Sequence, residues 1–176
     1  MRRIIGGVLL LLGALGLGQP NRAEAQLPLF VAGYAGAAFN TDDNRPGENS
    51  GGFSFQTEVG IRLARVSFGA EFGQHITGGD FKSKVYGGFV RLPSLIGEGP
   101  VQLYLVAGLG NYRFDPSGGK GSSTVGGSLG PGVSFRLRGS PVALGLEARF
   151  HSTFEKLPSI NNQQFISVVG GLELGL

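Results

Sequence analysis

The fold of this chain is decided by residues 53–63, which have the sequence FSFQTEVGIRL. Every second residue, from Phe53 to Leu63, is apolar or β-branched, whereas the residues between them are polar, charged or glycine. Such strict alternation predicts a β-strand with one apolar and one polar face. The alternation resumes after Ala64-Arg65 and continues to His75, so the two segments predict a β-hairpin with a tight turn.

Six further segments carry the same period of two. It is strict in residues 142–151 and 166–176 and less regular in residues 29–39, 83–92, 101–114 and 124–137. Long polar loops alternate with shorter turns between these segments; the loops are residues 40–52, 76–82, 115–123 and 152–163, and the turns are residues 64–65, 93–100 and 138–141. The pattern predicts an all-β fold, an eight-stranded antiparallel up-and-down transmembrane β-barrel with four long loops at one end. Strands of ~10–12 residues, tilted by ~45°, cover ~25 Å, the height of the apolar band of such barrels.

The first 25 residues have the pattern of a secretory signal peptide. Arg2 and Arg3 precede an apolar stretch over residues 4–18, and small residues flank Glu24. We therefore expect cleavage between Ala25 and Gln26. A cleaved signal places the protein outside the cytoplasm.

Residues 26–176 are then the barrel domain, and their length suits a single domain. The full chain has a formal net charge of +3, but residues 26–176 have 12 basic and 11 acidic side chains. The basic character thus belongs largely to the signal, and we expect no nucleic-acid partner. The chain contains no cysteine, which excludes disulfides, thiolate metal sites and cysteine catalysis.

The polar face of the predicted strands is rich in glycine and carries few charges, in nearly equal numbers of Glu and Arg. This composition suits a closed interior, where charges must be paired and where Arg can bind a carboxylate through two hydrogen bonds. The interior charge network is predicted to contain Glu58, Arg62, Glu71, Arg136, Glu147, Arg149 and Glu173, with Arg91 as a further candidate of less certain phase. The apolar face is then directed to lipid, with an aromatic girdle near the long loops made of Phe53, Phe55, Phe72 and Phe150.

The chain resembles the small OmpA/OmpX-type, porin-like outer-membrane β-barrel family. The resemblance rests on the glycine-rich last strand and on two stretches, VQLYLVAGLGNYRF from Val101 and ALGLEARFH from Ala143. It implies residence in the outer membrane of a double-membraned bacterium, with both termini in the periplasm. It also implies outer-membrane lipid, lipopolysaccharide and the barrel-assembly machinery as partners. The chain departs from the family in ending at Leu176, where such barrels usually have an aromatic residue.

Both histidines of the chain occur in a repeated pattern, Gly-x-Glu-x-x-x-His, which ends at His75 and at His151. A metal site needs converging ligands. The two histidines belong to the third and seventh predicted strands, which lie on opposite walls of the barrel. We therefore expect no metal site and no cofactor.

Residues near His151 contain the elements of a nucleophile, a base and an orienting acid: the Thr153 hydroxyl, His151 itself, and Glu147 or Glu155. Some eight-stranded outer-membrane barrels are lipid A deacylases with a comparable His/Ser/Glu set. Their active site faces lipid, however, whereas the alternation directs His151 to the interior. We therefore expect no catalytic residues.

The interior of an eight-stranded barrel is just wide enough for its own side chains. The sequence therefore predicts a non-enzymatic protein whose external loops serve envelope integrity or surface interaction, with the loop partner unidentified. Three alternatives stay open at this point. They are a narrow conduit for small or apolar solutes, a soluble periplasmic lipocalin-like carrier of opposite polarity, and a lipid-modifying barrel enzyme.

Overall fold

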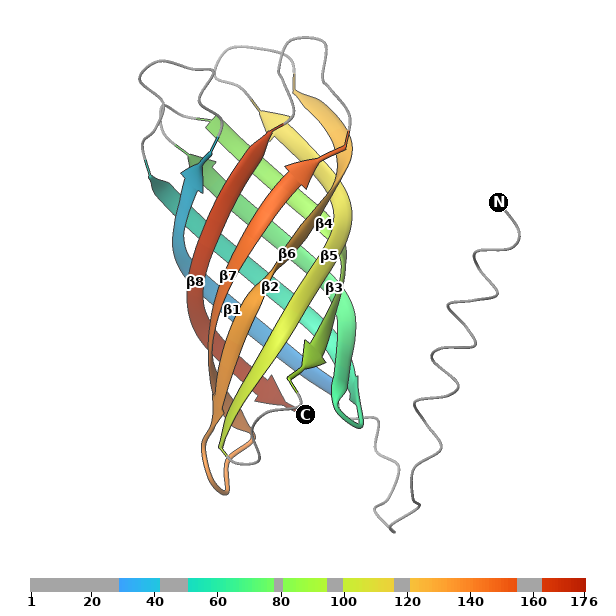
Figure 1. The fold of residues 1–176 in the computed structure, drawn as a ribbon, viewed down its shortest axis with the longest axis vertical. Helices are drawn as coiled ribbons and strands as arrows, with labels where there is room; N and C mark the ends of the chain where they lie inside the picture. The colour runs from blue at the N-terminus through green and yellow to red at the C-terminus, as the bar shows by residue number, and fades with distance from the viewer. Residues whose placement is uncertain (1–28, 42–50, 78–80, 95–99, 116–120, 155–162) are drawn as a thin grey trace, which may run out of the picture.

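The protein is a closed eight-stranded antiparallel β-barrel (Figure 1). The structure, a computed structural model, describes residues 29–41, 51–77, 81–94, 100–115, 121–154 and 163–176. The strands are β1 (Leu29–Asn40), β2 (Gly52–Leu63), β3 (Val66–Thr77), β4 (Phe81–Pro93), β5 (Val101–Asp115), β6 (Ser122–Arg136), β7 (Val142–Thr153) and β8 (Gln164–Gly175). The predicted signal peptide and its cleavage site lie outside the described residues. Within them, no helix is long and apolar enough to cross a membrane.

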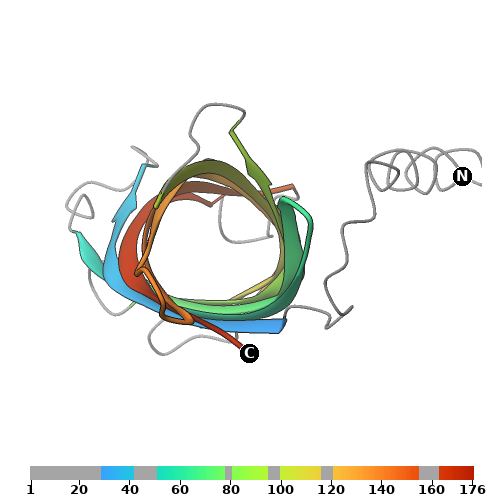
Figure 2. The same cartoon turned by 90° about the horizontal axis from the view of Figure 1, so that it is seen from below.

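Each strand pairs with its neighbours in sequence, and β8 closes the sheet on β1. The pairing can be followed from strand to strand, starting at Phe30 in β1 and passing once around the barrel. It returns to β1 at Asn40, ten residues beyond the starting point. A closed barrel with such a stagger needs strands that tilt relative to its axis, typically by ~35–45°. The ring is complete in the end-on view (Figure 2), so the described strands leave no free sheet edge.

The short connections and the chain terminus lie at one end of the barrel. Leu63 pairs with Val66 across the two-residue turn, where Ala64 has a φ of 52°. A second turn joins β6 to β7 and contains Gly139, with a φ of 71°. The backbone N–H of Leu176 donates to the Leu29 carbonyl, 2.8 Å away, so both ends of the barrel chain meet at this turn end. The predicted eight strands and their topology are confirmed.

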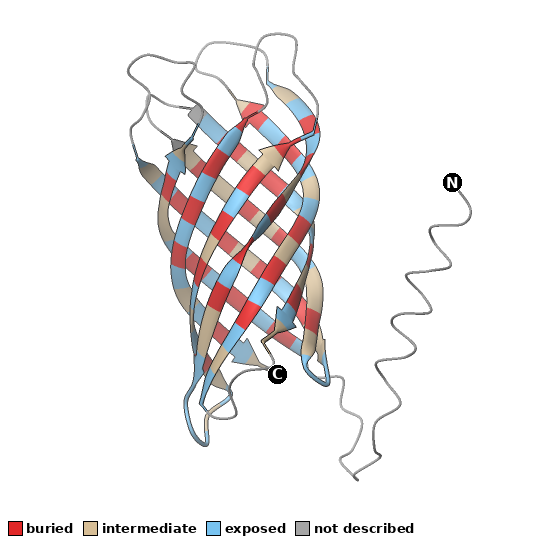
Figure 3. Cartoon of the chain, viewed as in Figure 1, coloured by how far each residue is buried: buried red, intermediate tan, exposed pale blue. Residues whose placement is uncertain are grey.

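Burial alternates along every strand between a buried inner face and an exposed outer face (Figure 3). Polar and charged side chains lie inside together with two clusters of apolar and aromatic residues, which include Phe30, Phe89 and Phe114, whereas large apolar side chains cover the outside. Leu146 and Leu129, for example, are 52% and 53% exposed. The four phenylalanines predicted to form the aromatic girdle all lie on this outer face: Phe53, Phe55 and Phe150 are exposed, and Phe72 is half-buried against Tyr86. The barrel thus has the polarity opposite to that of a water-soluble barrel.

Candidate functional site

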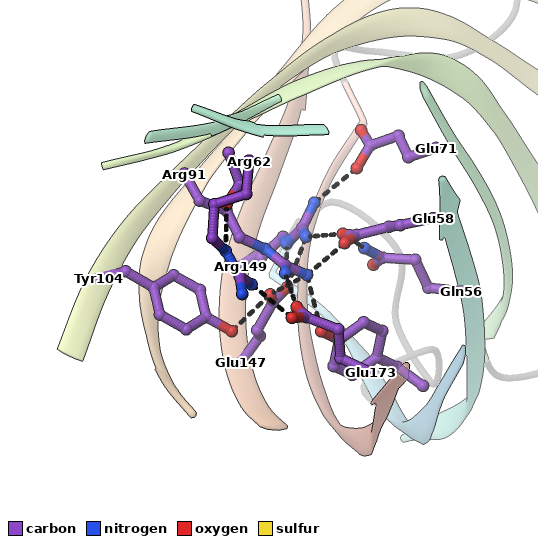
Figure 4. Close-up of polar contacts among 11 residues, drawn as sticks. Gln56, Glu58, Arg62, Glu71, Arg91, Tyr104, Glu147, Arg149 and Glu173 are labelled. Atoms are coloured by element: carbon purple, nitrogen blue, oxygen red, sulfur yellow. Dashed lines mark hydrogen bonds and ion pairs between the residues drawn. The ribbon is translucent and has the colours of Figure 1, made fainter. Parts of the chain in front are cut away.

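Charged side chains from five strands meet inside the lumen (Figure 4). They come from β2, β3, β4, β7 and β8. The group, called here the lumen cluster, consists of the carboxylates Glu58, Glu71, Glu147 and Glu173 and the guanidinium groups Arg62, Arg91 and Arg149. Alternation along the strands directs all seven side chains inward, and the narrow lumen then brings them into contact.

Arg149 connects three walls of the barrel. Its side chain is fully buried, and its Nη1 donates to Glu71 Oε2 at 2.6 Å. Its Nη2 donates to Glu58 Oε1 at 2.5 Å, and its Nε donates to Glu147 Oε2 at 2.7 Å. Each of the three guanidinium nitrogens thus has a carboxylate acceptor on β2, β3 or β7, which is the multidentate binding that a guanidinium fork allows.

Arg91 has the corresponding role nearer the turn end. Its Nη1 donates to Glu173 Oε2 at 2.8 Å, and its Nη2 lies 2.9 Å from Glu147 Oε1. It also pairs with Glu58, while Glu173 receives a second guanidinium from Arg62. Arg91 therefore joins β4 to β2, β7 and β8. The sequence left its phase uncertain, whereas the structure places it at the centre of the cluster.

Aromatic rings surround Arg91, and the sequence analysis did not identify them. The guanidinium carbon lies 5.2–5.6 Å from four ring centroids, those of Phe30, Tyr34, Phe89 and Tyr104. Such contacts stabilise a cation through the electron-rich ring faces. The Tyr34 hydroxyl accepts a hydrogen bond from Arg91 at 2.7 Å, and the Tyr104 hydroxyl donates to Glu147 at 2.7 Å. These residues alternate in β1, β4 and β5 with residues on the outer face, and this alternation would have predicted that they point inward.

Arg136 is a correction to the predicted network. It has the inward phase, but it is the last residue of β6 and is exposed at the open turn end. None of the ion pairs among the described residues includes it. The alternation in the sequence predicts which face of the strand a side chain lies on. Whether that side chain is enclosed depends on its depth along the barrel axis.

The two histidines require a second correction. They do belong to β3 and β7, but their ring centroids are only 5.0 Å apart. Opposite walls of this lumen are close enough for side chains to touch, which the argument from strand order did not allow for. Phe165 contacts both rings, stacking on His151 with a centroid separation of 4.3 Å and lying 4.8 Å from His75. This aromatic layer fills the lumen above the charged cluster.

Hydroxyl groups lie within hydrogen-bond distance of His75 Nδ1 and of both ring nitrogens of His151. His75 Nδ1 is 2.8 Å from Ser54 Oγ, and His151 Nε2 is 2.9 Å from Ser167 Oγ. His151 Nδ1 is 3.1 Å from the hydroxyl of Tyr112. Among the described residues, no three His, Asp or Glu side chains are grouped so that they could hold a metal ion.

The set proposed from sequence for catalysis is not assembled around His151. The Thr153 hydroxyl accepts a hydrogen bond from the Gln163 backbone N–H at 3.1 Å. Glu147 is committed to the lumen cluster, bonded to Arg149 and Tyr104. Glu155 lies outside the described residues.

Glycines provide the space that these large inward side chains occupy. A Cβ atom at Gly132 would overlap the ring of Tyr104. At Gly108, it would lie 2.6 Å from both Glu71 Oε1 and Ser128 Oγ. A cavity of about 20 Å³ lies beside Arg62 and Arg91 near the turn end, which is the size of one water molecule. The described lumen is therefore filled by side chains.

Comparison with solved structures gives the same architecture. The sequence of Neisserial surface protein A is 22% identical to this chain, and its crystal structure matches with a TM-score of 0.71. The match covers 84% of this chain and 97% of that one. The N-terminal β-barrel domain of Pseudomonas aeruginosa OprF is 9% identical, with a TM-score of 0.57, covering 86% and 98%. The chain has the fold of the small outer-membrane β-barrels. Neither a protein-family model nor a curated protein matches its sequence, so the likeness lies in the fold.

Removing Arg149 should strongly destabilise this barrel. Arg149→Met leaves Glu58, Glu71 and Glu147 without the cation that they share in the closed lumen, and we expect a loss of about 3–5 kcal/mol in the free energy of unfolding. The measurement is urea unfolding of the barrel refolded in lipid vesicles. Arg136→Met is the matched control because it removes the same charge from an exposed position, and it should change stability by less than about 0.5 kcal/mol. Equal effects of the two substitutions would show that the lumen cluster contributes nothing to stability.

Proposed function

We propose that this chain is an integral protein of the outer membrane of a double-membraned bacterium. The observation that carries the proposal is the outer face of the barrel, which is apolar or small from the turn end to near the loops. Its exposed residues include Val31, Val59, Leu103, Leu105, Leu109, Leu129, Leu144, Leu146, Val168 and Leu172. Such a continuous apolar surface far exceeds the few hundred Å² usual for a soluble monomer, whereas it matches the lipid contact of a membrane barrel.

The polarity of the lumen disfavours a soluble lipocalin-like carrier. That fold needs an apolar interior that can hold a ligand. Here the centre of the lumen contains buried Arg91 and Arg149 with their carboxylates. An apolar ligand would find neither space nor a suitable lining there.

The orientation in the membrane follows from the two ends of the barrel. The turn end also holds Leu29 and Leu176, and we assign this end to the periplasm, where the barrel-assembly machinery would insert the chain. The loops at the other end then lie outside the cell. Rigid scaffolds commonly present variable loops for binding, so envelope integrity or surface interaction through these loops is the role that we propose.

The proposal includes the absence of enzymatic activity and of solute conduction. His151 points into the lumen, and hydroxyl groups engage both of its ring nitrogens. The lumen cluster and the histidine layer together close the described part of the barrel. A lipid substrate on the outer wall would not reach either layer.

The first experiment is fractionation of cells that express the full chain. We expect recovery in the outer membrane, and a mobility on denaturing gels that differs between boiled and unboiled samples because the folded barrel resists detergent. Recovery as a soluble periplasmic protein would overturn the proposal.

A charge placed on the outer wall should prevent stable insertion. Leu146→Arg puts a cation near mid-depth on the lipid-facing side, which costs about 2–4 kcal/mol, whereas the cost falls to ~0–1 kcal/mol near the interfaces. Leu137→Arg, one residue beyond β6 at the turn end, is therefore the matched control. Folding into vesicles, followed by the gel shift, compares the two. Normal insertion of Leu146→Arg would contradict the assignment of the outer face.

Reconstituted protein should not conduct ions. With the lumen occupied by Arg91, Arg149 and their partners, we expect no discrete current steps in planar bilayers bathed in concentrated KCl. The control is the same detergent preparation without protein. Reproducible unitary steps that increase in number with the amount of folded protein would instead support a narrow conduit.

A further inference from the structure

The lumen cluster contains more acidic than basic groups. It has four carboxyl groups and three guanidinium groups, and Arg136, which points to the same face, is exposed at the turn end. If every carboxyl group were ionised, the cluster would hold one negative charge without a counterpart. Burying such a charge away from water is costly, and a carboxylate there commonly takes up a proton instead. The charge count therefore favours one protonated carboxyl group in the cluster.

Two of the carboxyl groups are direct cross-strand neighbours. Glu58 on β2 pairs in register with Glu71 on β3, and both side chains are buried. Like charges directly opposite each other in a sheet repel, and two carboxyl groups that share one site do not ionise together easily. These two also share a cation, since Arg149 contacts both of them. A proton is therefore most favourable on one member of this pair.

Glu71 is the member of the cluster with the fewest cationic partners. Among the described residues, its one ion pair is with Arg149, drawn as a single dashed line in Figure 4. Each of the other three carboxyl groups contacts two guanidinium groups. Glu58 also accepts a hydrogen bond from the Gln56 amide at 2.7 Å. A proton on Glu71 therefore sacrifices less attraction to cations than a proton on Glu58.

The second oxygen of Glu71 lies near an unused hydroxyl group. Glu71 Oε2 binds Arg149, whereas Oε1 lies 2.6 Å from the position that a Cβ at Gly108 would have, and Ser128 Oγ is equally close to that position. Ser128 is 7% exposed, and its Oγ has no hydrogen-bond partner among the described residues. Because Gly108 has no side chain, these two oxygens are neighbours. A hydroxyl oxygen can accept a hydrogen bond from a protonated carboxyl group.

We propose that the lumen cluster is a proton-binding site, in which Glu71 holds the proton on Oε1 beside Ser128 Oγ. Glu71 Oε2 still accepts the hydrogen bond from Arg149, and the three remaining carboxylates balance the three guanidinium groups. The other titratable or charged groups around Glu71 and Arg149 are His75 on β3, Glu58 on β2, Arg91 on β4, Tyr112 on β5, and Glu147 and His151 on β7.

A proton taken up on folding makes stability depend on pH with a definite sign. In the unfolded chain, a glutamate is ionised above about pH 4.3, so over the neutral range the folded protein binds one proton more than the unfolded chain. The free energy of unfolding then falls as the pH rises. The contribution of Glu71 is an about tenfold lower ratio of folded to unfolded protein per pH unit, or about 1.4 kcal/mol.

The experiment is urea unfolding of the protein in lipid vesicles over the neutral pH range. The test variant is Glu71→Gln, which has the shape of the protonated side chain but has no proton to release. The matched control is Asp115→Asn, which removes a carboxylate at the loop end of β5, outside the lumen. We expect the test variant to lose the about tenfold change per pH unit, whereas the control keeps it. The slopes are compared between proteins because the histidines, common to all three, titrate in the unfolded chain near pH 6.5.

Infrared absorption of the folded protein tests the proton directly. At neutral pH, we expect the C=O band of a protonated carboxyl group, which is separate from the bands of carboxylates. The band should be absent from Glu71→Gln and retained in Asp115→Asn. The stability of Glu71→Gln at neutral pH should also stay close to that of the unchanged protein, because Gln keeps a carbonyl oxygen for Arg149.

Three results would overturn the inference. The same pH dependence in the unchanged protein and in Glu71→Gln would show that Glu71 is ionised in both states. Absence of the carboxyl band from the folded protein would show that all four carboxyl groups of the cluster are ionised. A band that persists in Glu71→Gln would place the proton on another group. The inference concerns the lumen alone, so none of these results bears on the proposed outer-membrane location, which fractionation tests separately.

Discussion

The width of the lumen is the constraint on which the rest of this structure depends. Eight strands with a stagger of ten residues enclose a space in which side chains from opposite walls touch. Arg149 on β7 can therefore reach Glu71 on β3, and His151 can contact His75 across the same pair of strands. A wider barrel would hold water between these groups. In this one, several large inward side chains lie against glycines, as Tyr104 does at Gly132, Tyr112 at Gly126 and Tyr34 at Gly145.

The charged interior follows from the apolar exterior. A barrel whose outer face contacts lipid gains little by burying more apolar residues inside, and specific contacts must hold its walls together. Buried charges are costly unless their hydrogen-bonding groups are satisfied. The lumen cluster meets most of this requirement through Arg91 and Arg149, each of which contacts carboxylates on several strands, although the buried Arg91 Nε has no hydrogen-bond partner. Tyr34 and Tyr104 complete it with hydroxyl groups. The same contacts fill the centre of the described lumen with side chains from several strands.

Strands, topology and the facing of nearly every strand residue could be predicted from sequence because a period of two specifies them directly. The depth of each side chain along the barrel axis, and its reach across the lumen, could not be predicted. Arg136 shares the phase of the lumen residues but lies at the end of its strand, where the barrel is open. Arg91 follows two glycines and Phe89, a stretch where alternation is weak, so its central place was uncertain. The contact between His75 and His151 depends on the barrel radius, which the register of all eight strands sets together.

The two sets of charges in this barrel differ in how completely they are neutralised, and this difference follows from where each set lies. Inside, four carboxylates bind three guanidinium groups in a space closed to ions, so that charge is used to hold walls together. Outside, under the proposed function, the hydrocarbon layer excludes charge from most of each strand, and a cation on the outer face is tolerated only where the headgroups begin. Lys82, Lys84 and Arg113 are at that level with a single carboxylate among them. Asp115 pairs with Lys84 and Arg113 there, and charge so close to the end of the strands does not have to be enclosed as it is in the lumen.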